Sequence, residues 1–240
     1  MSYQRVLLKL SGEQFAGTRE QGIDAEFLAD LVDEIKDVIS STKTEMAIVV
    51  GGGNFMRGAA VAKHGVDRVT GDYMGMLATI LNGMALVDML EQKGLAGRLL
   101  TRVRVESVAE PYIRRRGVRH LEKGRVVVVA GGTGNPYVTT DTAAIVTALE
   151  LGCEVVMKAT KVDGVYDKDP AKHKDAVKYD KLGYDEAIQS EHINVMDDAA
   201  VSLAKENHLP IVVFGLLTKG NIKKVIQGQA IGTHVSHHTK

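Results

Sequence analysis

Six short apolar runs, separated by longer segments, constrain the fold of this chain more than any other feature. Each run has five or six residues, is rich in Val, Ile or Leu, and lacks the strict polar alternation of a half-exposed strand. Such runs are typical of strands covered on both faces. They are RVLLKL (5–10), MAIVV (46–50), RLLTRV (98–103), RVVVVA (125–130), EVVMKA (154–159) and IVVFG (211–215).

The segments between these runs have helical spacing. Apolar residues recur at three- and four-residue intervals from Phe27 to Ile39, with Asp24 as the expected N-cap. A second helix is expected from Leu77 to Val87, ended by Gly94. Further helices are expected at about 110–122, 140–151, 195–207 and 219–227. This alternation predicts an α/β fold of three layers, αβα, in which a mostly parallel central sheet lies between two layers of helices.

The composition excludes several broad classes of protein. Lys and Arg together number 30, as do Asp and Glu, so no net charge favours nucleic acid or a membrane surface. The single cysteine, Cys153, rules out an intramolecular disulfide framework and is expected to be a buried apolar side chain. No run resembles a signal peptide or approaches the length of a membrane span. We therefore expect a soluble, cytoplasmic protein.

Two charged segments are harder to interpret. The stretch from 167 to 183 has no clear period, and is expected to be a lid, an excursion from the sheet or a solvated loop. The basic run IRRRGVRH (113–120) lacks interleaved aromatic residues. We interpret it as a solvated helix face or subunit contact rather than an RNA site.

Four polar or glycine-rich segments follow the first, second, fourth and fifth runs. They are KLSGE, GGGNFMRG, GGTGNPYVTTD and KATKVDGVYDKDP. The carboxyl ends of parallel strands share one edge of a sheet, where ligands of open α/β folds bind. Backbone N–H groups of such loops bind phosphate well. Neither a P-loop nor a complete G-x-G-x-x-G fingerprint occurs, so a P-loop NTPase and a dinucleotide dehydrogenase are both disfavoured.

Charged residues in these segments suit phosphoryl transfer. Lys9, inside the first apolar run, needs a partner, and either a salt bridge or a phosphate would supply one. Arg57 offers a forked donor for phosphate. Asp141 could cap the next helix, or hold Lys9 and a second lysine, Lys158 or Lys161, around the phosphates. Asp72 is interpreted equally as the N-cap of its helix or as a ligand-binding residue.

The motifs resemble those of the bacterial uridylate kinases (UMP kinases) in the amino acid kinase family. The resemblance rests on LLKLSGE, VVGGGNFMRG, GDYMGMLAT, GTGNPYVTTDTAA, KATKVDGVYDKDP, VMDDAA and LPIVVF, which together span nearly the whole chain. It implies transfer of the ATP γ-phosphate to UMP in pyrimidine nucleotide biosynthesis, with Mg²⁺ bound through nucleotide phosphates. It also implies one amino acid kinase domain over residues 1–240, with an acceptor lobe at about 1–150 and an ATP lobe at about 151–240.

The resemblance also assigns roles to residues. The catalytic group is Lys9, Arg57, Asp141 and Lys158. The ATP-binding group is Lys9, Leu10, Ser11, Gly12, Gly53, Arg57, Thr160, Lys161, Tyr166 (near the adenine) and Asp169. The UMP-binding group is Gly52, Asp72 (through the ribose hydroxyls), Thr133, Gly134, Asn135, Pro136, Tyr137, Val138, Thr139 and Thr140.

Regulation and assembly are implied in the same way. The family is typically a homohexamer inhibited by UTP. Some members are activated by GTP through a segment that corresponds here to Gly17, Thr18, Arg19, Glu20, Gln21 and Gly22, although this segment does not closely match the expected form. Three further positions depart from the pattern: Val138 replaces an aromatic residue, Gly131 an Ala- or Ser-type residue, and Gly215 an Asn.

Two other functions compete with this assignment. One is a kinase of the same fold with a carboxylate acceptor, which would not need the loop from 133 to 140 or a ribose-reading Asp72. The other is a non-catalytic nucleotide sensor, which would be expected to lack Lys9 or Asp141, and both are present.

Overall fold

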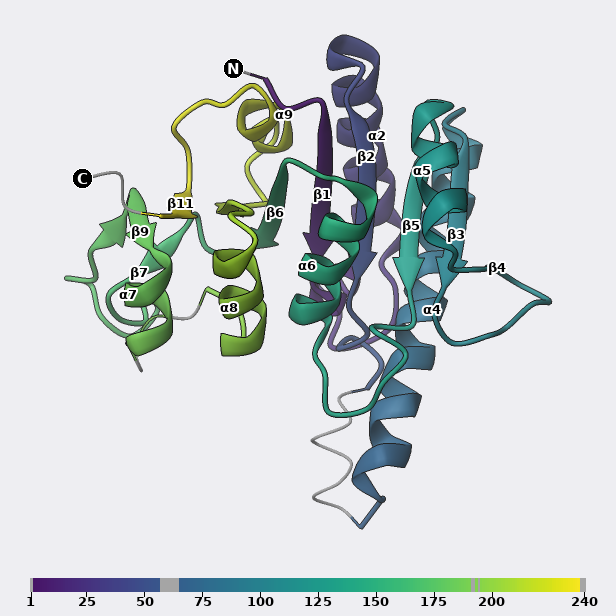
Figure 1. Cartoon of the computed structure of the whole chain (residues 1–240), viewed down its shortest axis with the longest axis horizontal. Coiled ribbons are helices and arrows are strands. Elements are labelled where there is room, and N and C mark those ends of the chain that lie inside the picture. The colour runs from purple at the N-terminus through teal and green to yellow at the C-terminus, as the bar shows by residue number, and fades with distance from the viewer. Residues whose placement is uncertain (1, 57–64, 191–192, 194, 238–240) are drawn as a thin grey trace.

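The computed structural model describes residues 2–56, 65–190, 193 and 195–237. Its main element is a nine-stranded sheet with the strand order β4-β3-β5-β2-β1-β6-β10-β11-β9 (Figure 1). The strands are β1 (Arg5–Leu10), β2 (Glu45–Val50), β3 (Gly97–Thr101), β4 (Glu110–Pro111), β5 (Val126–Ala130), β6 (Val155–Thr160), β9 (Lys181–Gly183), β10 (Ile211–Gly215) and β11 (Thr233–Ser236). All six predicted strands are confirmed, to within two residues at each end.

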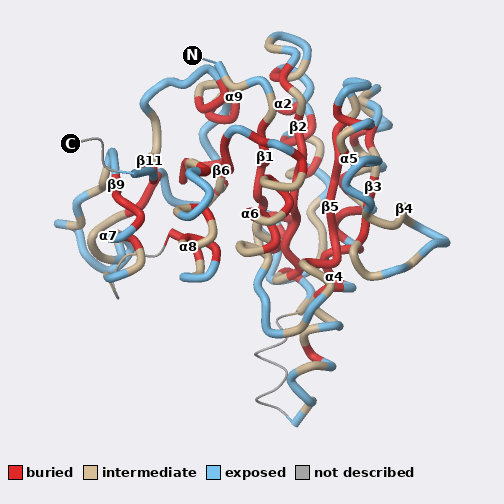
Figure 2. Tube along the Cα trace, viewed as in Figure 1, coloured by how far each residue is buried: buried red, intermediate tan, exposed pale blue. Residues whose placement is uncertain are grey.

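The helices cover both faces of this sheet, as the fold prediction required. They are α1 (Gly12–Phe15), α2 (Ala25–Thr42), α4 (Arg68–Gln92), α5 (Arg114–Glu122), α6 (Thr140–Leu151), α7 (Tyr184–Gln189), α8 (Asp198–Glu206) and α9 (Asn221–Ile226). Alternate residues of the central strands enter two separate cores. Leu8 and Ile48 pack with α2, α4 and α9, whereas Leu7 and Val49 pack with α5, α6 and α8. Figure 2 shows the resulting buried strands between partly exposed helices.

The sheet is parallel except at β11, which pairs antiparallel with β10. This one reversal makes the sheet mixed, and β9 then extends it through a parallel pairing with β11. The segment 167–183 leaves the sheet as far as β8 (Lys178–Tyr179), which forms a separate ribbon with β7 (Val165–Tyr166), and most residues from 167 to 177 are exposed. Its last three residues form β9 and so belong to the main sheet.

The helix boundaries correct several expectations. Asp24 caps α2 as predicted, through Glu26 N and Phe27 N. Asp67, not Asp72, caps α4, so the capping interpretation of Asp72 is wrong. The helix expected from 110 begins only at Arg114, because Glu110 and Pro111 form β4.

Helix α4 also corrects the expectation that no run approaches a membrane span. Among the described residues, it alone is long and apolar enough by length and composition. However, 44% of that apolar window is buried inside the protein. The side chains of Leu86 and Leu90 lie in the core, and Gly83 lies against Leu99 of β3. We therefore interpret α4 as a core helix with one exposed flank.

Candidate active site

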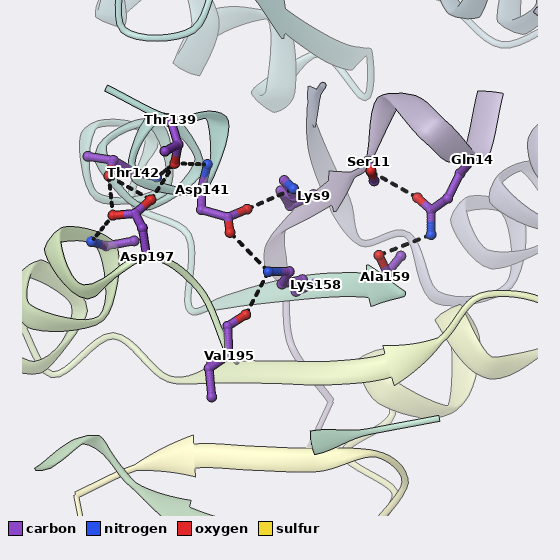
Figure 3. Close-up of polar contacts among 11 residues, drawn as sticks. Lys9, Ser11, Gln14, Thr139, Asp141, Thr142, Lys158, Ala159, Val195 and Asp197 are labelled. Carbon is purple, nitrogen blue, oxygen red and sulfur yellow. Dashed lines mark hydrogen bonds and ion pairs between the residues drawn. The ribbon is translucent and has the colours of Figure 1, made fainter. Parts of the chain in front are cut away.

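Two lysines and one carboxylate meet where β1 and β6 end. Lys9 Nζ lies 2.7 Å from Asp141 Oδ1, and Lys158 Nζ lies 2.9 Å from Asp141 Oδ2 (Figure 3). Lys9 and Lys158 are register partners on neighbouring strands, and Asp141 lies in the first turn of α6. The three side chains are between 8% and 15% exposed, so the charges are largely removed from water. We call these three residues the transfer centre.

The electrostatics of the transfer centre keep its carboxylate ionised. Burial alone would raise the pKa of Asp141, but the charges and hydrogen bonds of Lys9 and Lys158 outweigh it and hold that pKa below its usual value. Burial is also the main cause that lowers the pKa of Lys158, and the nearby Lys9 charge acts in the same direction while Asp141 opposes both. The centre therefore holds two lysines around one anion.

Asp141 does not cap α6, which corrects the capping interpretation. The N-cap is Thr139, whose hydroxyl accepts from Asp141 N and Thr142 N. The Asp141 side chain is thereby left to bind the two lysines. The interpretation of Asp141 as a holder of two lysines is the one that the geometry supports. Of the two candidates for the second lysine, Lys158 pairs with Asp141, whereas Lys161 is exposed.

A second carboxylate, Asp197, ties the start of α6 to the start of α8. It accepts hydrogen bonds from the hydroxyls of Thr139 and Thr142, and it caps α8 through Ala200 N. Close by, Lys158 Nζ donates to Val195 O at 2.6 Å. The segment before α8 therefore fixes both Lys158 and the helix that carries Asp141 (Figure 3).

Sequence reasoning missed these contacts. VMDDAA was recognised as part of a motif, but no residue in it was given a role. The available signal was an Asp at the N-cap position before the DAAVSLA helix, which by itself indicates only a cap.

Glycine-rich backbone forms the wall of the site opposite Asp141. A Cβ at Gly12 would overlap Gly53 N and lie 2.8 Å from the carbonyl carbon of Gly52, so no larger residue fits there. Gln14 fixes this turn, because its side chain accepts from Ser11 N and donates to Ala159 O at the end of β6. Peptide N–H groups are therefore brought close to Lys9, as a phosphate site requires.

A cavity of about 530 Å³ opens on this centre. It brings together many of the residues assigned to nucleotide binding, and adds several that were not. The predicted residues that line it are Lys9, Ser11, Gly12, Gly52, Gly53, Asp72, Val138, Thr139, Thr140, Asp141 and Lys158. The lining residues that had been given no role include Met56, Arg68, Gly75, Met76, Thr79 and Asp197.

Arg68 and Asp72 line the cavity, and Tyr137 contacts both of them. We call these three residues the acceptor rim. Arg68 Nε lies 3.0 Å from both carboxylate oxygens of Asp72. Tyr137 N donates to Asp72 Oδ2 at 2.8 Å, and the Arg68 guanidinium lies 5.3 Å from the centroid of the Tyr137 ring. Tyr137 has a left-handed φ of +67° and is 68% exposed. Arg68 and Tyr137 are therefore accessible to water, whereas the Asp72 side chain is 15% exposed. The backbone at Tyr137 is locally strained.

The acceptor loop between β5 and α6 needs glycine at the position noted as a departure. Gly131 has a φ of +82°, and a Cβ there would lie 2.9 Å from Val103 N. The Gly131 N–H donates to Thr79 Oγ1 at 2.7 Å, which attaches the loop to α4. Gly131 is thus required by this packing, whatever residue stands there in related proteins.

The other described residues assigned to ATP lie outside the cavity lining, in β1, β6, β7 and the loops after β6 and β7. Leu10 is fully buried, so only its backbone is available to a ligand. The Tyr166 hydroxyl donates to Asp163 Oδ1, and Asp169 forms an exposed pair with Lys172. Thr160 Oγ1 donates to Val162 O. Arg57 lies outside the described residues.

Two other groups of predicted residues are placed by the structure. The segment from Gly17 to Gly22 lies in the turn between α1 and α2. It contacts the GGGN loop after β2, where Asn54 Nδ2 donates a hydrogen bond to Gly22 O. At Gly215, where Asn was expected, an added Cβ would lie 3.2 Å from Asp163 Cα, and Asn221 Nδ2 donates to the Gly215 carbonyl.

The carboxylates around the cavity already have strong partners. Asp141 holds two lysines, Asp72 holds Arg68, and Asp197 caps α8. Among the described residues, no group of three or more His, Cys, Asp or Glu side chains is arranged to hold a metal. This donor set fits a Mg²⁺ ion that is carried on nucleotide phosphates, as that ion commonly is.

Comparison with known proteins identifies relatives over almost the full chain. The profile of the amino acid kinase family matches residues 4–215. A UMP kinase from Bacillus anthracis is similar in structure, with a TM-score of 0.93 and 37% identity over 98% of this chain and 97% of that one. A UMP kinase from Ureaplasma parvum has a TM-score of 0.90 and 32% identity over 98% and 100% of the two chains. A uridylate kinase from Archaeoglobus fulgidus has a TM-score of 0.75 and 28% identity with the same coverage.

Proposed function

This chain belongs to the amino acid kinase family, and on that premise we propose that it transfers the γ-phosphate of ATP to UMP, giving UDP and ADP. The observation that carries the proposal is the transfer centre, in which Lys9 and Lys158 flank Asp141 beside glycine-rich backbone. Its placement in a chain that matches UMP kinases over 98% of its length favours UMP as the acceptor.

The proposed reaction needs no base from the protein. A non-bridging oxygen of the UMP phosphate forms the new bond to the γ-phosphorus, while the bond to the β–γ bridging oxygen breaks. The electron pair of the broken bond remains on the β-phosphate of ADP. Because the attacking phosphate oxygen is already anionic, catalysis requires alignment and charge neutralisation rather than proton removal.

The chain's own residues supply both requirements. Lys9 and Lys158 neutralise the charge on the transferring group, and Asp141 holds them at a fixed separation before substrate arrives. The N–H groups of Gly12 and Gly53 bind phosphate oxygens. Mg²⁺, when bound with the nucleotide, would add further charge neutralisation. Asp72 accepts hydrogen bonds from the ribose hydroxyls of UMP.

The two lobes are part of the same proposal. Residues up to about 150 form the acceptor lobe and the remainder the ATP lobe, with Tyr166 near the adenine. We retain UTP inhibition, GTP activation through Gly17–Gly22, a homohexamer and a cytoplasmic location as predictions that accompany the assignment to UMP kinase.

The proposal is tested by measuring ADP release from ATP and Mg²⁺ with UMP, CMP, AMP, acetylglutamate or aspartate as acceptor. We expect turnover with UMP, and a loss of orders of magnitude in Lys9→Ala with the fold retained by circular dichroism. Turnover with acetylglutamate or aspartate would instead assign a carboxylate acceptor. Saturable UMP or UTP binding without any turnover would assign a nucleotide sensor.

A further inference from the structure

The order of contacts along α4 gives the direction in which an acceptor nucleotide lies in the cavity. Gly52 lies against the middle of the helix, since a Cβ there would be 2.7 Å from Gly75 O, and on its other side it contacts Gly12 beside the transfer centre. Asp72 and then Arg68 follow toward the start of the helix, and both line the cavity. The sequence of contacts from the centre outward is therefore Gly12, Gly52, Asp72 and Arg68.

This order places the base of the acceptor beside Arg68. In the proposed function, the UMP phosphate lies near Gly52 and the transfer centre, and its ribose lies at Asp72. The base is attached to the side of the ribose away from the phosphate. Arg68 is one helical turn beyond Asp72, and four residues of a helix rise about 6 Å, which matches the step from ribose to base.

Arg68 has hydrogen-bonding capacity left for a ligand at this position. Its contacts with described residues are the Nε hydrogen bonds to Asp72 and the packing of the guanidinium over Tyr137. A guanidinium has five N–H donors and no acceptor, so the two terminal nitrogens carry four further donors. The pairing with Asp72 and Tyr137 limits where these donors can lie.

Resting on the proposed function, we propose that Arg68 reads the acceptor base and makes the site prefer uracil to cytosine. Uracil has a carbonyl oxygen at the ring position where cytosine has an amino group. A group that only donates hydrogen bonds binds the carbonyl, and it leaves the amino group facing another donor.

Within the acceptor loop, Asn135 carries the only amide side chain, and the threonines of the loop carry hydroxyls that can likewise both donate and accept. Its amide carries both donors and an acceptor, so by rotation it can match either uracil or cytosine. Asn135 Nδ2 lies 3.5 Å from Thr133 O, which leaves it weakly held. Arg68, held at two points and able only to donate, is the better discriminator.

The test is kcat/KM for UMP and for CMP, with saturating ATP and Mg²⁺, in the wild type, Arg68→Met, Arg68→Lys, Asn135→Ala and Arg98→Met. Arg98→Met is the matched control, because Arg98 pairs with Glu91 at the opposite end of α4. We expect Arg68→Met to lower kcat/KM for UMP by about 10- to 100-fold, the range for a lost charge-assisted hydrogen bond, with less than about a 3-fold change for CMP. Arg68→Lys recovers part of the preference.

The outcomes separate this inference from the function on which it rests. A UMP/CMP ratio that falls in Arg68→Met and stays within about 2-fold in Arg98→Met supports the inference. An equal loss for both acceptors in Arg68→Met, or a collapse of the ratio only in Asn135→Ala, overturns it while the function stands. No turnover of UMP by the wild type overturns the proposed function, and the inference with it.

Discussion

The transfer centre and the acceptor rim are both built on a carboxylate held by basic side chains, but the basic side chains differ in burial. In the centre, Asp141 holds Lys9 and Lys158 at 2.7 and 2.9 Å, and every side chain is at most 15% exposed. In the rim, the Asp72 side chain is also 15% exposed, but the Arg68 side chain that holds it is 43% exposed. Loss of the Asp141 charge therefore leaves two lysines unpaired away from water, whereas loss of the Asp72 charge leaves an arginine that water reaches.

This difference suggests a division of tasks between the two regions. Buried, mutually dependent charges are set in place before substrate arrives, which suits the step that neutralises phosphoryl charge. Exposed contacts are readily exchanged for contacts with a ligand, which suits recognition of the acceptor. In this account the centre determines how fast phosphate is transferred, and the rim determines to what it is transferred.

The largest expected effect is that of Asp141→Asn. It leaves two partly buried lysines without their anion, so we expect the free energy of unfolding to fall by about 3–5 kcal/mol and turnover to fall with it. The control is Asp72→Asn, which disrupts the more exposed pair and should cost about 1 kcal/mol or less. Urea denaturation of the two variants measures the difference, and equal losses would remove the distinction between centre and rim.

A smaller effect is expected from Asp197→Ala. The variant loses the cap of α8 and the acceptor for Thr139 and Thr142, which together stabilise the fold by about 2 kcal/mol. Because Asp197 positions the helix that carries Asp141, we also expect kcat to fall about 10-fold with little change in KM. Asp67→Ala removes a different helix cap, that of α4, and serves as the control. A similar drop in kcat in both variants would reduce Asp197 to a stabilising cap.

The response to pH should also distinguish the centre. The folded-state pKa of Asp141 is below its ordinary value of 3.8, so its stabilising contribution is complete above that value. The contribution is lost as pH falls from about 3.8 through the lowered pKa, because the folded state must then take up a proton. Stability measured against pH should show this acid loss in the wild type and a weaker one in Asp141→Asn. If wild type and Asp141→Asn lose the same stability at acid pH, protonation of Asp141 is not the cause of that loss.

The smallest effects are expected at Tyr137. Replacement by Gly relieves the strain of the left-handed backbone, about 1 kcal/mol. It also removes the aromatic ring that packs against the Arg68 guanidinium, a contact that contributes about 0.5–1 kcal/mol to stability. These two effects nearly cancel, so the melting temperature of Tyr137→Gly should lie within a few degrees of that of the wild type. Tyr137→Phe should leave the melting temperature unchanged. A large loss of stability in Tyr137→Gly would mean that the rim is structurally fixed like the centre.

The sequence allowed the strands, the edge of the sheet that carries the site and the residues of the centre to be predicted. Buried Val-rich runs can form little else than strands covered on both faces, and a lysine inside such a run needs a partner. That rule predicted a partner for Lys9 without deciding between a salt bridge and a phosphate, and the structure shows the salt bridge to Asp141. The choice of Lys158 over Lys161 depended on strand register, which places Lys158 beside Lys9 and cannot be read from composition.

Other features depended on tertiary contacts that no local pattern reveals. The local sequence around Asp197 predicts only a helix cap. Its second role, as the acceptor for hydroxyls at the start of α6, exists only because α6 and α8 pack together. Asp67 and Asp72 are equally good capping residues by type, and the actual start of α4 decided between them. Arg68 carries no local signal of a role, since an arginine one turn before an aspartate is a common pair on helix surfaces.

The most direct test of the account is a comparison of kcat with UMP affinity in Lys158→Met. The substitution removes one charge from the centre without touching the rim. Wild type and variant are compared by ADP release and by calorimetric titration with UMP. We predict that kcat falls by about 10²–10³-fold while the UMP dissociation constant changes by less than about 3-fold. An unchanged kcat, or a loss of UMP binding as large as the loss of turnover, would contradict the division between centre and rim.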